Sequence, residues 1–515
     1  MSSVGTLGVF LSSSLCLFIL WSLLKFLHKV WWTPIRIQRA LRSQGINGPP
    51  YRFLHGNTKE IFRMRKESNS KPMEISSHNI FPRILPEMYS WISIYGKNCV
   101  NWYGPKPRLI VTESELVKEV LNNREKAYGK MDAEGFVKKL FGDGLVFSEG
   151  EKWVKVRKLA NHAFNAERLK NMIPDMIAST EMMVGRWKQY EGKEVDVSEE
   201  FRMLTSEVIS RTAFGSSYLE GKDIFEMVLR LSVLSNGKVL KIRLPGLSKI
   251  FKTAADIESD KLVQGIRDSI IRIIKKREEV MTGEVDRFGT DYLGLLVKAY
   301  HDSDEKNRIT VDDVVDECKT FYIAGQETTA TLLGWTVFLL AIHTDWQEKA
   351  RQEVVELFGQ QNPNSEGIGR LKIMNMIINE SLRLYPPAPA TVRKAEHEVR
   401  LGKYIVPANT IIQIPPLAFH HDPQIWGEDV LLFKPERFSE GVAKAANNNP
   451  TAFIPFGLGP RICVGMNFAI NEAKIVLSMI LQRYSFTLSP TYIHSPYTMV
   501  TVRPKHGVQV IIHPL

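Results

Sequence analysis

One stretch, from Thr310 to Ile342, is almost unbroken in its apolar character and has the pattern of a single long helix. Thr310 and Asp313 form a Thr-x-x-Asp pattern, which is typical of the start of a helix. At about 1.5 Å per residue, a helix of about 33 residues spans roughly 50 Å, the width of a whole domain. A helix this long and this apolar must run through a core, so the chain is expected to fold around it.

The segments that follow predict further helices and a few short strands. Thr344 begins a capped helix that Gly359 helps to end, and Leu371–Leu384 is another helix, stopped by Pro386. Short β-branched runs predict strands at Tyr404–Val406, Thr410–Ile414 and Val508–Ile512. Residues 50–515 contain no linker-like run and no internal repeat, so we expect one large, mostly α domain with small β-sheets.

The N-terminal segment predicts a membrane anchor. Residues 1–24 carry no charged side chain, and Val4–Leu24 is long enough to cross a bilayer core, which takes about 20 residues. Basic residues follow this run instead of preceding it, which favours a signal anchor over a cleaved leader and places the N-terminus in the lumen. These basic residues are Lys25, Lys29, Arg36, Arg39 and Arg42.

The chain is therefore expected to have three parts. Residues 1–30 form the transmembrane anchor, with Trp21, Trp31 and Trp32 at the membrane interface. Residues 31–57 form a basic, proline-containing hinge, in which Gly48-Pro49-Pro50 makes a stiff corner. Residues 58–515 form the globular domain, on the cytosolic side.

Charge and cysteine content exclude several classes of protein. The net charge is +11, but the positive residues are spread out, which is typical of a solvated surface and disfavours nucleic-acid binding. The four cysteines, Cys16, Cys99, Cys318 and Cys463, have no close partners in the sequence. Neither a disulfide framework nor a zinc site is predicted, and the folded part is expected in a reducing compartment.

The loop from Phe456 to Gly465 carries the strongest chemical signal, the pattern F-x-x-G-x-R-x-C-x-G. Gly459 and Gly465 permit close approach of the backbone to a flat macrocycle, and Arg461 is placed to neutralise an acidic substituent of it. A helix predicted from near Met466 would direct its positive end toward Cys463 and favour a thiolate, the form that ligates metals. A free cysteine is usually only a small buried residue. This pattern, however, arises by chance on the order of once in ten thousand chains of this length.

On these residues the sequence resembles the cytochrome P-450 superfamily along essentially its whole length. The resemblance implies the cytochrome P-450 fold, with a long central helix over a haem b group whose iron has Cys463 as axial ligand. In that family the thiolate donates electron density that helps to cleave the bond within dioxygen. The resemblance also implies that Phe456 and Arg461 contact the haem.

Ala324-Gly325-Gln326-Glu327-Thr328-Thr329, within the long helix, matches the oxygen-activation motif of the family. Gly325 costs up to about 1 kcal/mol in a helix interior, and close approach of haem and dioxygen supplies a reason for it. The resemblance implies that Thr328 positions a proton donor beside bound oxygen and that Glu327 relays protons. The alternative is that Thr328 only bonds back to the preceding turn of its helix.

Other motifs match positions that hold the haem or support its loop. Trp153 and Arg157 match the W-x-x-x-R helix of the family, whose Trp and Arg contact a haem propionate. Arg393 matches a further propionate contact. Glu380 and Arg383, three residues apart on one helical face, form with Arg437 a buried ionic cluster that supports the cysteine loop. Without the family pattern, such a pair is more often surface decoration of little energetic value.

Gly48–Asn57 resembles plant members of the seventy-two clan, which oxidise terpenoids, steroids, growth regulators and xenobiotics. The sequence has no glycine fingerprint for a nicotinamide or flavin, since Gly142 and Gly144 lack the third glycine. Electrons from NADPH are therefore expected from a separate flavoprotein reductase, at the endoplasmic reticulum membrane. We expect a lipophilic substrate. By resemblance, its pocket should be lined by residues 136–145, Phe321–Thr328, Ala388–Val392 and Tyr497–Met499.

The favoured hypothesis is a monooxygenase that inserts one oxygen atom from dioxygen into this substrate. One alternative is a haem-thiolate isomerase or dehydratase that needs neither dioxygen nor a reductase. Glu327 and Thr328 disfavour it, because such an enzyme has no use for proton delivery to oxygen. The other alternative is a haem protein that only binds or transfers electrons, which would not use the pocket implied by the long helix.

Overall fold

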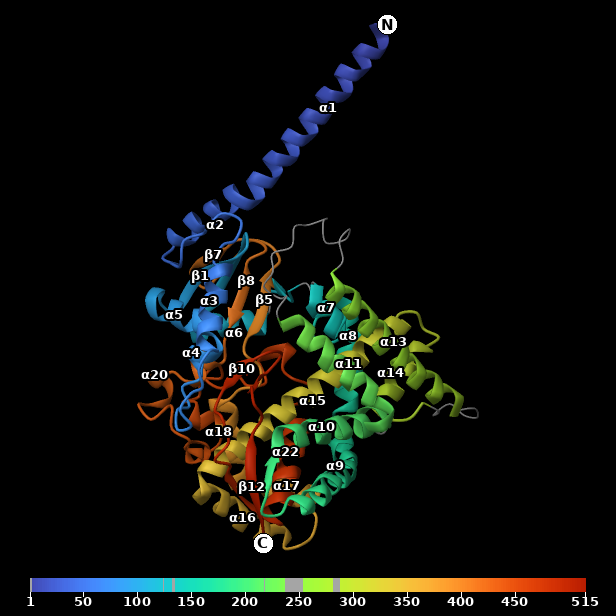
Figure 1. Cartoon of the computed structure of the whole chain (residues 1–515), viewed down its shortest axis with the longest axis vertical. Helices are drawn as coiled ribbons and strands as arrows, with labels where there is room; N and C mark the ends of the chain where they lie inside the picture. The colour runs from blue at the N-terminus through green and yellow to red at the C-terminus, as the bar shows by residue number, and fades with distance from the viewer. Residues whose placement is uncertain (1, 124, 132–134, 217, 237–252, 281–287) are drawn as a thin grey trace.

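The structure, a computed structural model of the chain, describes residues 2–123, 125–131, 135–216, 218–236, 253–280 and 288–515. The central element is α15 (Val311–Ile342), which crosses the middle of the body (Figure 1). The hydroxyl of Thr310 accepts a hydrogen bond from the backbone N–H of Asp313, whose carboxylate accepts one from the N–H of Thr310. This reciprocal cap confirms the predicted start of the helix.

Helices surround α15 on most sides, and the chain supplies them from both of its halves. Those before it are α3 (Thr58–Ser68), α4 (Phe81–Ile84), α5 (Pro86–Tyr95), α6 (Ser114–Asn122), α7 (Gly135–Phe141), α8 (Gly150–Ala163), α9 (Ala166–Trp187), α10 (Val197–Phe214), α11 (Tyr218–Asn236), α13 (Ala254–Val280) and α14 (Tyr292–Tyr300). Those after it are α16 (Thr344–Phe358), α17 (Ser365–Arg370), α18 (Lys372–Leu384), α19 (Leu417–His420), α20 (Pro423–Trp426), α21 (Val442–Ala445) and α22 (Met466–Leu481). The 3-10 turns among the described residues are η2 (Lys188–Tyr190), η3 (Pro435–Phe438) and η4 (Gly459–Arg461). The long helix packs against α10, α14, α18 and α22, which buries almost its whole length, as its composition predicts.

One predicted detail is wrong at the junction of α15 and α16. Thr344 was expected to cap α16, but the capping position is His343, and no side chain accepts a hydrogen bond there. His343 is the single residue between the two helices, so Thr344 already lies inside the second one. Gly359 ends α16 with a positive φ of 57°, as expected.

The strands form small sheets. A five-stranded sheet has the order β1-β2-β8-β5-β3, and it is antiparallel except where β2 and β8 run parallel, with Arg108 opposite Ile411. A second sheet has the order β4-β12-β9, and β6-β7 and β10-β11 are hairpins. The strands are β1 (Asn98–Tyr103), β2 (Lys106–Val111), β3 (Tyr128–Gly129), β4 (Glu194–Asp196), β5 (Thr391–Ala395), β6 (Val399–Leu401), β7 (Tyr404–Val406), β8 (Ile411–Ile414), β9 (Tyr484–Leu488), β10 (Pro496–Thr498), β11 (Val502–Pro504) and β12 (Gln509–Pro514). The three predicted strands correspond to β7, β8 and β12.

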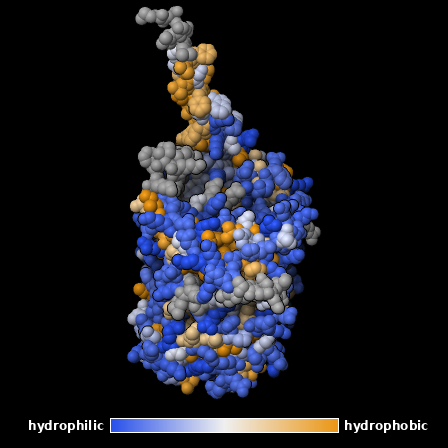
Figure 2. Space-filling view, turned by 90° about the vertical axis from the view of Figure 1, so that its right-hand side faces the viewer, coloured by the Kyte–Doolittle hydropathy of each residue, from blue (hydrophilic) through white to orange (hydrophobic). Residues whose placement is uncertain are grey.

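The N-terminus is a long helix that projects from the body. It comprises α1 (Ser2–Leu27), a π-helical turn η1 (His28–Trp32) and α2 (Thr33–Arg42). Figure 2 shows its hydrophobic side chains standing clear of a mostly hydrophilic body. Residues Gly8–Arg42 contain a span apolar and long enough to cross a membrane, none of it buried in the protein, which is consistent with the anchor.

Residues 31–57, expected to be a hinge, pack against the five-stranded sheet. Ile37 and Leu41 of α2 are buried in the core that surrounds this sheet. A side chain at Gly48 would collide with the backbone carbonyl of Val100 in β1. The division of the chain at residues 30 and 57 remains a prediction.

Candidate functional site

An apolar cavity of about 320 Å³ lies between α15 and the loop that precedes α22. It brings together nearly all of the haem-site residues predicted from the sequence. The predicted residues that line it are Trp153, Arg157, Gly325, Thr328, Arg393, Phe456, Arg461, Cys463 and Gly465. Two predicted residues, Glu327 and Gly459, do not line it.

Cys463 is held by a tight turn at the edge of this cavity. The turn η4 precedes it, α22 begins three residues later, and the backbone N–H of Cys463 donates to the carbonyl of Phe456 at 2.9 Å. Burial raises the pKa of the Cys463 thiol, whereas the backbone of Gly465 and the charge of Arg157 lower it. The side chain of Cys463 is exposed to the cavity, and the backbone of Gly465 at the start of α22 and the charge of Arg157 both favour the thiolate, against the effect of desolvation on its pKa.

Three glycines of the two motifs stand at close contacts within the protein, and two of them, Gly325 and Gly465, also line the cavity. Gly459 has a φ of +76°, and a side chain there would collide with the carbonyl of Leu121 at the end of α6. A Cβ on Gly325 would lie 2.8 Å from the side chain of Ile209, so this glycine permits the close crossing of α10 and α15. Only Gly465 lies beside the sulfur, since a Cβ there would be 3.9 Å from Sγ of Cys463.

Two arginines hold the cysteine loop and face the cavity. Arg157 of α8 donates to the carbonyl of Ile462 at 2.7 Å, and its Nε is buried without a partner in the described structure. Arg461 donates to the carbonyl of Ser148 at 2.8 Å, and its guanidinium lies 4.3 Å from the centre of the Trp153 ring. Both side chains therefore fix local backbone and leave positive charge at the cavity wall.

Arg393 and Lys130 add further positive charge at the same wall. Burial, followed by the charge of Arg461, lowers the pKa of Arg393 to about 10. Burial, together with Arg393 and Arg461, lowers the pKa of Lys130 to about 7. Glu149 is the carboxylate near both, and it lies 3.8 Å from Arg461. These cations are thus held close together in partly desolvated positions, an arrangement that favours an anionic ligand.

Sequence reasoning missed Lys130, because it belongs to no motif. It follows β3, and the pairing of Gly129 with Lys394 of β5 brings it beside Arg393. This contact joins segments about 260 residues apart, and no local pattern signals it.

The two predicted proton-transfer residues lie on different sides of α15. The hydroxyl of Thr328 donates to the carbonyl of Ala324 at 2.6 Å, as the purely structural alternative expects, but this side chain also lines the cavity. The carboxylate of Glu327 is directed elsewhere, where it accepts hydrogen bonds from Arg503 at 3.0 Å and Thr501 at 3.1 Å. A direct contact of Glu327 with the cavity is therefore absent from the described structure.

The expected ionic cluster is buried and reaches the cysteine loop. Nε and Nη2 of Arg383 each donate to the carboxylate of Glu380 at 2.7 Å, and Arg437 lies 3.6 Å from it. Arg383 also donates to the carbonyl of His420 at 2.8 Å, and Nε2 of His420 accepts from the N–H of Ile454 at 3.1 Å. The sequence did not indicate His420, which links the cluster to the residues that lead into the Cys463 loop.

Comparison with models of protein families identifies the family of this chain. The family model described as Cytochrome P450 matches residues 87–511, most of the chain. The chain belongs to the cytochrome P450 family. It is 64% identical to "Cytochrome P450 CYP749A22" of Panax ginseng over 98% of this chain and 97% of that one.

More distant relatives place this cytochrome P450 in the plant seventy-two clan. It is 44% identical to "Cytochrome P450 CYP72A616" of Paris polyphylla, over 94% of this chain and 95% of that one. It is 42% identical to "11-oxo-beta-amyrin 30-oxidase" of Glycyrrhiza uralensis, over 100% of this chain and 99% of that one. The protein is thus a P450 enzyme, and one of these relatives is named as an oxidase.

The cavity fits the haem that this family implies. It offers a sulfur ligand from Cys463, apolar walls for a flat macrocycle, and a cluster of cations for two propionates. The unpartnered Nε of Arg157 is a donor that such an acid would satisfy.

Only some of the predicted substrate-contacting segments line the cavity. Leu145, Phe321, Ala388 and Thr391 line the cavity, as expected. Tyr497–Met499 does not line it, because the hairpin of β10 and β11 is held on the other side of α15.

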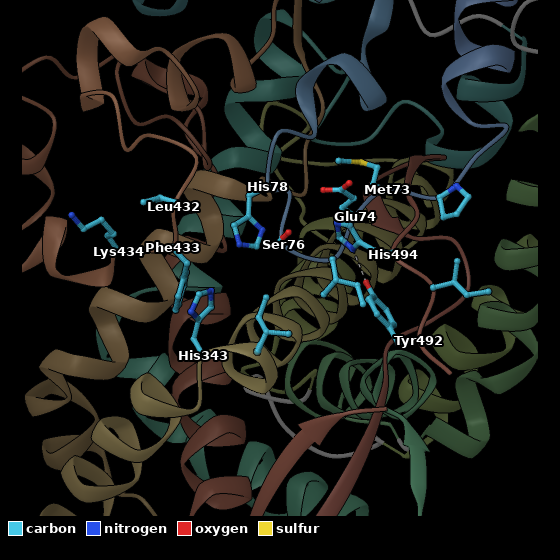
Figure 3. Close-up of a pocket in the computed structure, with 14 residues that line it drawn as sticks. Met73, Glu74, Ser76, His78, His343, Leu432, Phe433, Lys434, Tyr492 and His494 are labelled. Atoms are coloured by element: carbon cyan, nitrogen blue, oxygen red, sulfur yellow. Dashed lines mark hydrogen bonds between the residues drawn. The ribbon is translucent and has the colours of Figure 1, made fainter. Parts of the chain in front are cut away.

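A second and larger cavity, of about 1020 Å³, lies at the surface beside the C-terminal end of α15 (Figure 3). Two of its histidines are already hydrogen-bonded: Nδ1 of His78 to the hydroxyl of Tyr385 at 2.8 Å, and Nδ1 of His494 to that of Tyr492 at 2.9 Å. Within the described residues no three His, Cys, Asp or Glu side chains are arranged for a metal. Cys463 does not line this cavity, so it is not the haem site.

These histidines predict a loss of stability in mild acid. Burial lowers the pKa of His78 from 6.5 to about 3 and that of His494 from 6.5 to about 4. Below pH 6.5 the unfolded chain therefore binds more protons than the folded one. The free energy of unfolding falls as the pH decreases from 6.5 toward 4, and the loss is about 2 kcal/mol per imidazole at pH 5. In urea unfolding, the loss between pH 7 and pH 5 should shrink clearly in His78→Gln/His494→Gln. An unchanged loss, equal to that of the exposed-site control His506→Gln, would assign the acid sensitivity to other groups.

Proposed function

We propose that this cytochrome P450 binds haem b through Cys463 and inserts one oxygen atom from dioxygen into a lipophilic small molecule. The observation that carries the proposal is that Cys463 and Thr328, on separate segments, line the same apolar cavity. The sulfur of Cys463 lies on one side of that cavity, and the hydroxyl of Thr328, on α15, lies at the cavity wall.

The residues proposed to hold the haem are Cys463 for the iron and the cations of the cavity wall for the propionates. Those cations are Lys130, Arg157, Arg393 and Arg461, with Trp153 packed against the last of them. When bound, the haem supplies the activation of dioxygen, to which a thiolate ligand contributes electron density.

The chain itself supplies positioning and protons. The apolar wall, which includes Phe321, Leu332 and Ala388, orients a lipophilic molecule and excludes bulk water. Thr328 is proposed to hold a proton donor at the cavity. Glu327 is proposed to exchange protons behind it, because its carboxylate borders a separate recess of about 190 Å³ lined also by Arg503 and Thr331.

Thr328→Ala should separate the consumption of NADPH from the formation of product. Haem and substrate binding should survive, because the lost hydroxyl bonds only to Ala324 of its own helix. General acid catalysis of this kind is worth about 10²–10⁴-fold, so hydroxylated product should fall while hydrogen peroxide rises. Thr336→Ala, which removes a similar back-bonded hydroxyl away from the cavity, is the matched control. Product per NADPH equal to that of the unmodified enzyme would contradict the role of Thr328.

The substrate class is proposed to be terpenoid or steroid-like, with hormones and xenobiotics as related members. The apolar cavity and the relative named 11-oxo-beta-amyrin 30-oxidase support this choice. A screen of plant lipophiles for a change in the haem absorbance on binding identifies candidates. Each candidate is then tested for its effect on NADPH oxidation in the presence of a reductase. If none of the candidates increases the rate of NADPH oxidation, the proposal is contradicted.

Electrons are proposed to come from NADPH through a separate flavoprotein reductase, with the enzyme anchored in the endoplasmic reticulum membrane. The exposed apolar helix at the N-terminus supports a single span with the domain in the cytosol. A glycosylation tag should therefore be modified at the N-terminus, and modification only at the C-terminus would reverse this orientation.

A further inference from the structure

Three exposed apolar side chains surround the surface cavity beside the C-terminal end of α15. They are Ile75, Leu432 and Ile493, of whose surfaces 41%, 57% and 47% are accessible to solvent. They come from distant parts of the chain: the loop between α3 and α4, the segment between α20 and η3, and the segment between β9 and β10. Single exposed apolar residues are normal on any surface, but a group of them around a cavity is typical of a binding site.

The wall of this cavity is also apolar and partly aromatic. Phe433 and Tyr492 are buried in it, and Ile342 is half-buried. Figure 3 shows His343 beside Phe433 on one side of the space and His494 beside Tyr492 on another. At about 1020 Å³ the cavity is as large as the pockets that hold drug-sized molecules, which have about 300–1,000 Å³.

The imidazole of His343 is the polar group of this wall that lacks a partner. Its Nε2 is buried and has no hydrogen-bond partner in the described structure. The ring lies 4.9 Å from that of Phe433, and the side chain as a whole is half-buried. A small rotation of the ring therefore offers Nε2 to a molecule in the cavity, and a hydrogen bond there would satisfy it.

The charges around the cavity favour a neutral ligand. Burial lowers the pKa of His343, as it does for the other two imidazoles of the cavity, so all three are neutral at pH 7. Lys434 is the one Lys or Arg among the described lining residues, and it forms an ion pair with Asp429 at 2.7 Å. An acid would therefore lack a free cation and meet the carboxylate of Glu74, and an amine would lose hydration beside a neutral ring. A hydroxyl group fits, because a neutral imidazole can donate or accept one hydrogen bond.

We infer that this cavity is a second binding site, separate from the haem site, for a lipophilic alcohol whose hydroxyl group pairs with Nε2 of His343. The apolar rim and wall contact the lipophilic part of the molecule, and the imidazole recognises its single polar group. The inference depends neither on the haem chemistry nor on the identity of the substrate.

Two photoreactive probes test the site in the full-length holoenzyme in phosphatidylcholine nanodiscs. They are 4-hydroxybenzophenone and benzophenone, which differ only in the hydroxyl group. Clotrimazole, an azole that coordinates haem iron, keeps both out of the haem cavity, and peptide mass spectrometry locates the label after irradiation. We expect saturable labelling of residues 72–78 and 492–494. Half-saturation by 4-hydroxybenzophenone should need a concentration about fivefold lower than by benzophenone, the effect of one hydrogen bond.

The variant His343→Phe tests the hydrogen bond by itself. It keeps an aromatic ring beside Phe433 and removes the nitrogen, so the two probes should label it at the same concentration. Benzophenone should bind to it as it does to the unmodified protein. Unchanged haem absorbance verifies that the variant is folded.

The variant Ile75→Gln/Ile493→Gln tests the apolar rim and should weaken both probes by about tenfold, since it removes apolar contacts. Ile94→Gln/Val355→Gln is the matched control, because both residues are exposed and neither lines the cavity. This control should bind both probes unchanged. Labelling that is absent from the two segments, or that does not saturate, would overturn the inference. Equal affinity for the two probes, or a preference for the hydroxyl probe that persists in His343→Phe, would overturn it as well.

Discussion

Arg383→Ala should yield little folded, haem-containing protein. The substitution leaves the carboxylate of Glu380 buried, with the N–H of Lys434 at 3.0 Å and Arg437 at 3.6 Å as its remaining partners. Removing one partner of a buried pair costs about 3–5 kcal/mol, a large share of the roughly 5–15 kcal/mol that stabilises a typical domain. It also frees the carbonyl of His420, so the support of the cysteine loop is lost along with the ion pair. The yield of holoprotein and its urea midpoint measure the effect.

Arg202→Ala is the matched control, because Arg202 and Glu199 form a pair with the same spacing of three residues, but with an exposed carboxylate. Breaking it should change stability by less than about 1 kcal/mol. If Arg383→Ala accumulates as holoprotein with a midpoint close to that of the control, the cluster does not support the loop.

Cys463→Ser should abolish activity and the absorbance band of the reduced, carbon monoxide-bound protein from which the family takes its name. A hydroxyl is far less acidic than a thiol and a poorer donor to iron, so the serine does not replace a thiolate. The loop itself should persist, because its turn is made by backbone bonds such as that from Cys463 to the carbonyl of Phe456. Absorbance spectra and turnover of the purified variant measure the effect.

Cys99→Ser and Cys318→Ser are controls, since both residues are buried free cysteines that do not line the cavity. They should keep the band even if they are less stable. A Cys463→Ser protein with the band at full intensity would show that another group binds the iron.

Features that depend on neighbouring residues could be predicted from the sequence. The start of α15 follows from a cap formed within four residues, Thr310 to Asp313. The loop around Cys463 is likewise contiguous, so its motif alone indicated the turn and the helix that follows. The pair Glu380 and Arg383 lies within one turn of α18, and it is buried, as the family resemblance implies.

Features that depend on distant segments could not be predicted. Glu327 was assigned to the proton pathway by its place beside Thr328, but its direction is set by Arg503, 176 residues away. Gly325 lines the cavity, as the motif predicts, but its close contact with Ile209 on another helix is not indicated by the motif. Lys130 reaches the cavity through strand pairing. In each case a tertiary contact, for which the local pattern carries no signal, determines the role.

Turnover of a responsive substrate under isotopically labelled dioxygen, with NADPH and a reductase, tests the central claim most directly. If the enzyme is a monooxygenase, each product molecule gains one labelled oxygen atom, and omission of NADPH stops the reaction. A product that forms without NADPH, or that contains no labelled oxygen, would contradict the account and favour an isomerase or dehydratase.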